Sequence, residues 1–276
     1  MIEIFHVSDL HFEKSKKRTA EAQLLLSKIK RKFGIEQDGD RYLLITGDIT
    51  QHGWKLQNKK AFDALVPFKK KVRVVPGNHD YGFQGFVYAR KCARYFEGEL
   101  AGKLGMVHPF ISKMPYSEMI EDGEENKVLL IGINSCLMTR SIWDIAKGDI
   151  GEKQRNSLDK ILKKKANEDI PKIVFLHHIP HRRARGIGMS LKDYKKFMTV
   201  VRNKVDALIF GHEGAMSNPK LDVRKKTPVP VRELKLRSGK GQGIRYYLDA
   251  NQSVKEQSCY RIRIEGTEVS ARRFRL

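Results

Sequence analysis

Five short apolar runs of this chain each end in side chains that can bind a metal ion. The runs span residues 2–7, 42–46, 72–75, 172–176 and 206–210, and their β-branched and aliphatic residues predict strands. The groups that follow them are Asp9 and His11, Asp48, Asn78-His79-Asp80, His177-His178, and His212. In α/β proteins, ligands bind beyond the carboxyl ends of parallel strands. The chain is therefore constrained to a fold in which these strand ends converge.

Amphipathic segments separate the predicted strands and predict helices. These segments cover residues 20–33, 57–68, 85–97, 152–166 and 191–204, and a further strand is predicted at 127–134. Strands that alternate with helices indicate parallel sheet built from βαβ units. We therefore assign the chain to the α/β class.

The last sixty residues follow a different pattern. Residues 243–250, 258–266 and 268–276 alternate between apolar and polar side chains with no helix between them, which predicts an antiparallel closing sheet. Residues 216–242, rich in Pro, Gly and Lys, predict a long loop. We expect one domain over 1–276, with the motifs in 1–215 and a β-rich closing segment in 216–276.

The chain is strongly basic, with 54 Lys and Arg against 32 Asp and Glu and a formal net charge of +22. The charge indicates either a solvated basic surface or a polyanionic partner such as a nucleotide, a nucleic acid or an anionic membrane. No apolar run approaches the roughly 18–20 residues of a membrane span, and the start lacks a signal-peptide pattern. Three widely spaced cysteines favour a reducing compartment, so we expect a cytoplasmic protein. Its oligomeric state is left open.

Taken together, the strand-end motifs resemble those of the calcineurin-like metallophosphoesterase superfamily. The motifs D-x-H, G-D, G-N-H-D, H and G-H occur in that order within residues 1–215. Each is common by chance, whereas all of them in order and at strand ends are specific. The resemblance implies a four-layer α/β/β/α sandwich with mixed sheets, like that of metal-dependent phosphatases, holding two divalent metal ions.

The resemblance also implies which residues bind the metal ions. The first ion would be held by Asp9, His11 and Asp48. Asp48 would bridge to the second ion, whose other ligands would be Asn78, His177 and His212. Carboxylate, imidazole and amide ligands suit Mn²⁺, Fe or Zn²⁺ better than Ca²⁺, and we expect Mn²⁺.

Two residues of the third motif are expected to act in catalysis. His79 would stabilise the transition state or protonate the leaving oxygen, and Asp80 would orient the His79 ring. His178 is expected to support the site or to face the substrate. The basic loop that follows could grip a phosphate, which makes His181, Arg182 and Arg183 further candidates for substrate binding.

The expected reaction is hydrolysis of a phosphoester by a hydroxide bound between two metal ions. A phosphodiester, either a cyclic nucleotide or another nucleotide diester, is the favoured substrate. The alternatives are a nuclease-like enzyme, which the charge favours, a phosphomonoesterase or protein phosphatase, and a non-catalytic module that binds phosphate or nucleic acid. The protein phosphatase branch usually has a further Asp and an Arg in the second motif, and residues 47–52, GDITQH, contain neither.

The last motif departs from the family pattern and leads to a prediction about metal affinity. Many members have a second His two residues after the first and use it as a ligand of the first ion, but this chain has Gly214 there. With one protein ligand fewer, the first site should bind its ion more weakly than the second. A calorimetric titration with Mn²⁺ should show two unequal transitions, and two transitions of equal affinity would contradict the prediction.

Overall fold

The structure is a computed structural model of the whole chain. It describes residues 1–13, 16–35, 39–83, 87–106, 114–123, 126–136, 147–180, 191–212, 244, 246–250 and 253–276. The principal helices are α1 (Lys16–Phe33), α2 (Lys55–Leu65), α3 (Arg90–Tyr95), α4 (Gly151–Leu162), α5 (Tyr194–Val201) and α6 (Ser253–Glu256). A π-helix continues α3 over Phe96–Ala101, and a 3₁₀ turn, η2, covers Asn78–Tyr81.

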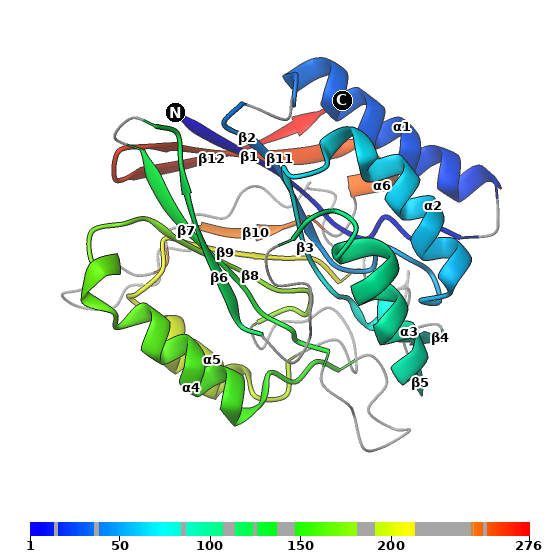
Figure 1. Cartoon of the computed structure of the whole chain (residues 1–276). Coiled ribbons are helices and arrows are strands. Elements are labelled where there is room, and N and C mark those ends of the chain that lie inside the picture. Colours follow the sequence, from blue (N-terminus) through cyan, green and yellow to red (C-terminus); the bar gives the residue numbers. More distant parts are fainter. Residues whose placement is uncertain are drawn as a thin grey trace, which may run out of the picture.

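Two five-stranded mixed sheets form the centre of the molecule (Figure 1). The first has the order β12-β11-β1-β2-β3; β1, β2 and β3 are parallel, and β11 runs antiparallel to both of its neighbours, β1 and β12. Its strands are β1 (Ile2–Val7), β2 (Arg41–Thr46), β3 (Val72–Val75), β11 (Ser258–Glu265) and β12 (Glu268–Arg275).

The second sheet has the order β10-β9-β8-β7-β6, and only β6 runs antiparallel to its neighbour. Its strands are β6 (Tyr116–Glu121), β7 (Lys127–Gly132), β8 (Lys172–Phe175), β9 (Ala207–Phe210) and β10 (Tyr246–Asp249). A small two-stranded sheet pairs β4 (Gly82–Phe83) with β5 (Val87–Tyr88).

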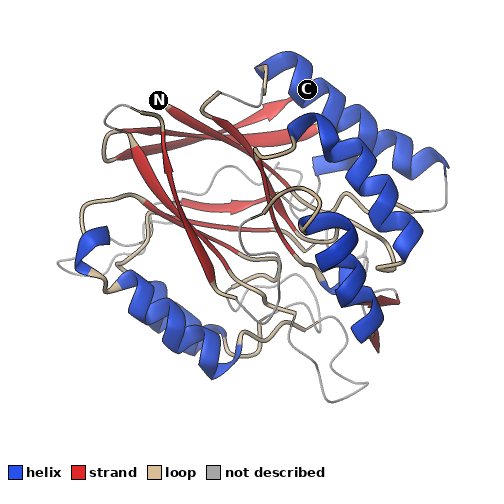
Figure 2. Cartoon of the chain, viewed as in Figure 1, coloured by secondary structure: helices blue, strands red, loops and turns tan. Residues whose placement is uncertain are grey.

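Alternation of buried residues shows how the layers pack. In β8, Ile173 and Phe175 join the core shared with the first sheet, whereas Val174 packs in a second core with α4 and α5. The helices α1 and α2 cover the opposite face of the first sheet, through residues such as Leu25 and Leu65. Helices therefore lie outside two adjacent sheets, as Figure 2 shows, and the expected four-layer sandwich is confirmed.

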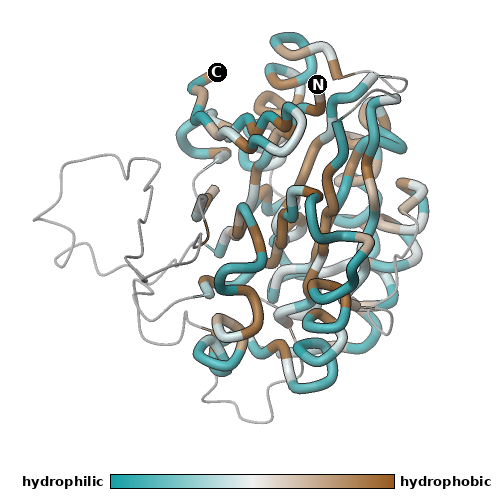
Figure 3. Tube along the Cα trace, turned by 90° about the vertical axis from the view of Figure 1, so that its left-hand side faces the viewer, coloured by the Kyte–Doolittle hydropathy of each residue, from teal (hydrophilic) through white to brown (hydrophobic). Residues whose placement is uncertain are grey.

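Hydrophobic residues concentrate along the strands in Figure 3, and polar residues on the outer helices. This distribution follows from burial, because β7, β8 and β9 are covered on both sides and read as continuous apolar runs. Among the described residues, no helix combines the length and the hydrophobicity that crossing a bilayer requires.

Two sequence predictions differ from the structure, and one strand was not predicted. Residues 243–250 do not join an antiparallel closing sheet, because β10 pairs in parallel with β9 in the second sheet while β11 and β12 extend the first. The pattern indicated a strand, but a pattern does not specify a partner. Strand β6 was not predicted, since it lies at a sheet edge and is only partly buried. The helix predicted at 85–97 begins only at Arg90. The predicted loop at 216–242 lies outside the described residues.

The shared core gives a prediction for stability. Phe175 is fully buried between the sheets, where its ring packs edge-on against Tyr116 at 5.8 Å. Phe175→Ala should lower the free energy of unfolding by about 3–5 kcal/mol, because it removes apolar contacts and leaves a cavity. Chemical denaturation would measure the change. The control Leu56→Ala, at a side chain 58% exposed, should change it by less than about 0.5 kcal/mol.

Candidate metal centre

The predicted ligands lie where strands of both sheets end. Asp9 and His11 follow β1, Asp48 follows β2, and Asn78 opens the η2 turn after β3. From the second sheet, His177 follows β8 and His212 follows β9. The structure brings these segments together, and all of the ligands except Asn78 are buried.

The backbone at these positions adopts a conformation that few residues other than glycine use. Asp9, His11, Asp48 and His212 have φ values of 58°, 48°, 49° and 75°, in the left-handed region. Such backbone conformations cost about 1–3 kcal/mol each and persist only where the surrounding structure enforces them. Four sharp turns at four proposed ligands therefore indicate that the fold is arranged to direct these side chains toward one point.

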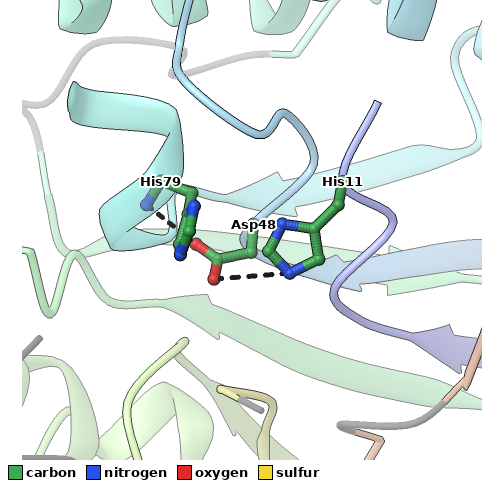
Figure 4. A group of neighbouring side chains, drawn as sticks. All are labelled: His11, Asp48 and His79. Atoms are coloured by element: carbon green, nitrogen blue, oxygen red, sulfur yellow. Dashed lines mark hydrogen bonds and ion pairs between the residues drawn. The ribbon is translucent and has the colours of Figure 1, made fainter. Parts of the chain in front are cut away.

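One group of potential ligand atoms comes from His11, Asp48 and His79, all within 4.8 Å of one another. Figure 4 shows the Asp48 carboxylate between the two imidazole rings, which lie edge to face at 4.9 Å. Nε2 of His11 is 3.9 Å from Oδ2 of Asp48 and 3.8 Å from Oδ1 of Asp9. Asp9 is therefore adjacent to this group. The sequence predicted His79 as a catalytic residue, and the structure places its ring among the potential metal ligands.

A second group of potential ligand atoms comes from Asp48, His177 and His212. Nε2 of His177 lies 2.8 Å from Nδ1 of His212, 3.1 Å from Oδ1 of Asn78 and 3.3 Å from Oδ2 of Asp48. All of the residues expected to hold the second ion thus converge on His177. Asp48 belongs to both groups, which is the position a bridging carboxylate requires.

Hydrogen bonds to the backbone fix the tautomers of two histidines. Nδ1 of His177 donates to the carbonyl of Thr46 at 2.7 Å, so Nε2 is the nitrogen that faces the second group. Nδ1 of His79 donates in the same way to the carbonyl of Gln51 at 2.9 Å. A ring that donates one N–H to a carbonyl is the usual arrangement of a histidine that binds a metal through its other nitrogen.

The charges at the centre favour a cation. Burial raises the pKa of Asp48, but the positive charges of His177 and His79 lower it by more, so it lies well below its usual range. For His177, burial lowers the pKa, and the carboxylate of Asp48 more than offsets this and raises it to about 9. The buried carboxylates thus draw a proton onto His177, and a divalent ion fits the same oxygen and nitrogen donors.

Asp80 does not orient the His79 ring, so that expectation is wrong. Its fully buried carboxylate accepts hydrogen bonds from the backbone N–H groups of Ile49, Thr50 and Gly77, at 3.2, 2.7 and 2.9 Å, and from the Thr50 hydroxyl. The carbonyl of Gln51 holds the ring instead. Burial, followed by the charge of Asp48, raises the pKa of Asp80 to about 6.

His178 faces the protein interior. Its ring is fully buried, and Nδ1 lies 2.8 Å from the hydroxyl of Ser135. The ring also packs 4.5 Å from that of His212. These contacts support the neighbouring histidines and give no support to the expected substrate contact. The other predicted substrate-binding residues, His181, Arg182 and Arg183, and also Gly214, lie outside the described residues.

Two glycines beside the ligands have no room for a side chain. A Cβ atom on Gly77 would lie 2.1 Å from Oδ1 of Asp48, and one on Gly211 would lie 1.8 Å from the Ser8 hydroxyl. The glycines of the G-N-H-D and G-H motifs therefore allow the backbone to approach the ligand shell. Ser8, Thr46, Gln51 and Ser135 also contact the site, and no sequence pattern indicated them. Two of these act through backbone carbonyls, and a backbone contact leaves no signal in the residue type.

Comparisons with known proteins agree with this geometry. The family model for calcineurin-like phosphoesterases matches residues 2–216. A dimetal phosphatase from Danio rerio is similar in structure, with 13% identity, a TM-score of 0.50 and coverage of 76% of this chain and 81% of that one. So is the sulfate thiohydrolase SoxB from Thermus thermophilus, with 11% identity, a TM-score of 0.54 and coverage of 99% and 56%. At such identities these structures show a shared fold only.

A search of curated protein sequences finds no match. The match to the family model nevertheless covers most of the chain, from the first strand to just beyond the last predicted ligand, His212. This protein therefore belongs to the calcineurin-like phosphoesterase family.

Proposed function

We propose that this protein hydrolyses a nucleotide phosphodiester with two divalent metal ions, Mn²⁺ being favoured over Fe and Zn²⁺. The observation that carries the proposal is the position of Asp48, which is shared by two groups of ligand atoms. Its partners would be His11 and Asp9 toward one ion, and Asn78, His177 and His212 toward the other. When bound, the ions would neutralise phosphate charge and lower the pKa of a water molecule between them.

His79 is positioned to act on the leaving group. Its Nδ1 donates to the Gln51 carbonyl, and its backbone N–H donates to Oδ1 of Asp48 at 3.0 Å. The ring is therefore fixed beside the centre with Nε2 free to exchange a proton. At that atom His79 would hold a proton and donate it to the alkoxide that leaves phosphorus.

The sequence of the second motif supports a diester over a phosphoprotein as substrate. Residues 47–52 lack the additional Asp and Arg that the protein phosphatase branch usually has there. A net charge of +22 also fits a substrate with a charged nucleotide. We further propose that the chain acts as a single domain in the cytoplasm, which its three free, buried cysteines support.

A comparison of two chromogenic substrates tests the proposed reaction. A phosphodiester and the matching monoester should be incubated with Mn²⁺, Fe²⁺, Zn²⁺ or a chelator. We expect turnover that requires metal and favours the diester. Preference for the monoester would instead indicate a phosphomonoesterase, and the absence of turnover with every metal would indicate a binding module.

His79→Gln tests the role of the ring. Loss of the proton donor should lower kcat by about 10²–10⁴-fold. If His79 only transfers protons, a calorimetric Mn²⁺ titration of the variant should keep both transitions. Loss of one transition would show that His79 is itself a metal ligand, which its place in the first group also allows.

Asp80 connects the two loops that carry Asp48 and His79. It accepts hydrogen bonds from both loops, at Ile49 and Thr50 after β2 and at Gly77 after β3. Its carboxylate would therefore act on the reaction only by positioning the residues of these loops.

Asp80→Asn should lower kcat, because an amide has only one oxygen to accept these bonds and its NH₂ group would face backbone N–H donors. The free energy of unfolding should fall by about 1–3 kcal/mol. The control Asp63→Asn, at an exposed position in the last turn of α2, should change neither quantity. An Asp80→Asn variant with full kcat and reduced stability would show that the connection serves the fold alone.

A further inference from the structure

Basic side chains gather on the helix-covered face of the first sheet, away from the metal centre. Residues paired directly across neighbouring strands point to the same face of a sheet. Glu3 on β1 is paired with Arg41 on one side and with Arg263 on the other. Two residues before Arg263 on the same strand, Arg261 is paired with Arg272. Lys32, in the last turn of α1, reaches the same surface. We call this set the arginine array: Arg41, Arg261, Arg263, Arg272 and Lys32.

One buried carboxylate orients three of these guanidinium groups. The oxygens of Glu3, whose side chain is 6% exposed, lie 3.0 Å from Nε of Arg41, 3.0 Å from Nε of Arg263 and 3.7 Å from Nη1 of Arg261. The side chains of Arg41 and Arg263 remain 47% and 40% exposed. A single negative charge thus fixes three positive groups and neutralises only one, while most of their N–H donors stay available to a ligand.

Three cations of the array, Lys32, Arg261 and Arg272, lie against the ring of Phe274. The Phe274 ring centroid lies 4.5 Å from the guanidinium carbon of Arg261, 5.3 Å from that of Arg272 and 5.8 Å from Nζ of Lys32. Arg261 and Arg272 are directly opposite each other, and like charges in that relation destabilise a sheet. Neither Arg272 nor Lys32 pairs with a carboxylate among the described residues. The array therefore carries uncompensated positive charge at fixed positions.

We propose that the arginine array binds the phosphate backbone of a nucleic acid. Guanidinium groups match phosphate geometry with two parallel N–H donors, and a pre-oriented group loses less entropy when it binds. All of its donors are cationic and match phosphate oxygens, which every nucleotide carries, so binding should depend little on sequence. Its cations come from α1 and from the strands β2, β11 and β12, which lie on either side of Glu3 on β1.

An anionic membrane is a weaker fit for the same charge. Binding to a membrane surface normally adds an exposed apolar group to basic residues. The large hydrophobic side chains exposed in the described structure are Met1, Leu24, Trp54, Leu56 and Val66. None comes from the strands that carry the array, and Leu24, on α1, precedes Lys32 by about two helical turns. The surface supplies rigid charge without an apolar anchor, which is the combination that a solvated polyphosphate backbone requires.

The array and the metal centre are separate sites. Glu3 lies near the start of β1, and Asp9 follows its end, which places them about 20 Å apart at the usual rise per residue of a strand. The inference thus goes beyond the proposed hydrolysis and does not depend on it. Binding can be measured with the metal ions removed, so a failure of either proposal is distinguishable from a failure of the other.

The test measures how salt affects binding of a fluorescent single-stranded DNA of mixed sequence, by anisotropy, in the presence of a chelator. The variant Arg272→Ala with Lys32→Ala removes two cations that make no ion pair within the described part of the chain. It should weaken binding by about tenfold at low salt. It should also lower the slope of log K against log salt by about 1–2, since each cation lost releases one counterion fewer.

The matched control is Lys153→Ala with Lys160→Ala, which removes the same charge from exposed positions on α4, on the opposite side of the molecule. It should leave the slope nearly unchanged. Equal losses in both double variants would show that only net charge matters and would overturn the proposal. Wild-type protein that binds phosphatidylserine vesicles but not DNA would overturn it too. Circular dichroism should confirm that both variants are folded.

Discussion

The buried carboxylate of Asp48 is the contact on which the rest of the site depends. It accepts the backbone N–H of His79, lies 3.3 Å from Nε2 of His177 and 3.9 Å from that of His11, and leaves no room for a side chain at Gly77. A charge in so dry a place is costly unless it is paired. The surrounding histidines supply part of that compensation, and a metal ion held among them would supply the rest. The requirement explains why polar groups from several strands converge on Asp48.

Convergence depends on how the two sheets are packed. Asp48 and Asn78 follow strands of the first sheet, whereas His177 and His212 follow strands of the second. The shared apolar core, which includes Ile4, Leu44 and Phe175, sets the separation between the sheets and so the separation of the ligands. The hydrogen bond from His177 to the Thr46 carbonyl then ties a side chain of one sheet to the backbone of the other. The packing of the two sheets therefore fixes the distances between the residues of the site.

Electrostatics differ between the two ends of the first sheet. At the carboxyl ends of β1 and β2, burial lowers the pKa of His177, but the buried carboxylates of Asp48 and Asp9 raise it by more and so favour a positive charge. Near the start of β1, one carboxylate, Glu3, faces three arginines, and the balance favours an anion. A single sheet thus presents binding preferences of opposite sign at its two ends. The net charge of +22 does not predict which ion either end binds, because the preference for a cation or an anion depends on the charged groups nearby.

Residue patterns alone predicted the α/β class, the strands whose ends carry polar groups and the residues that gather around Asp48. They could do so because apolar runs and polar strand ends are local features. Three further features depend on tertiary packing. Strand β10 joins the second sheet, Gln51 rather than Asp80 binds the His79 ring, and His178 contacts Ser135 in the interior. Each of these depends on which segments meet in space, and a backbone carbonyl offers the same acceptor whatever the residue. Residue types fix what can bind, and packing selects which of those contacts form.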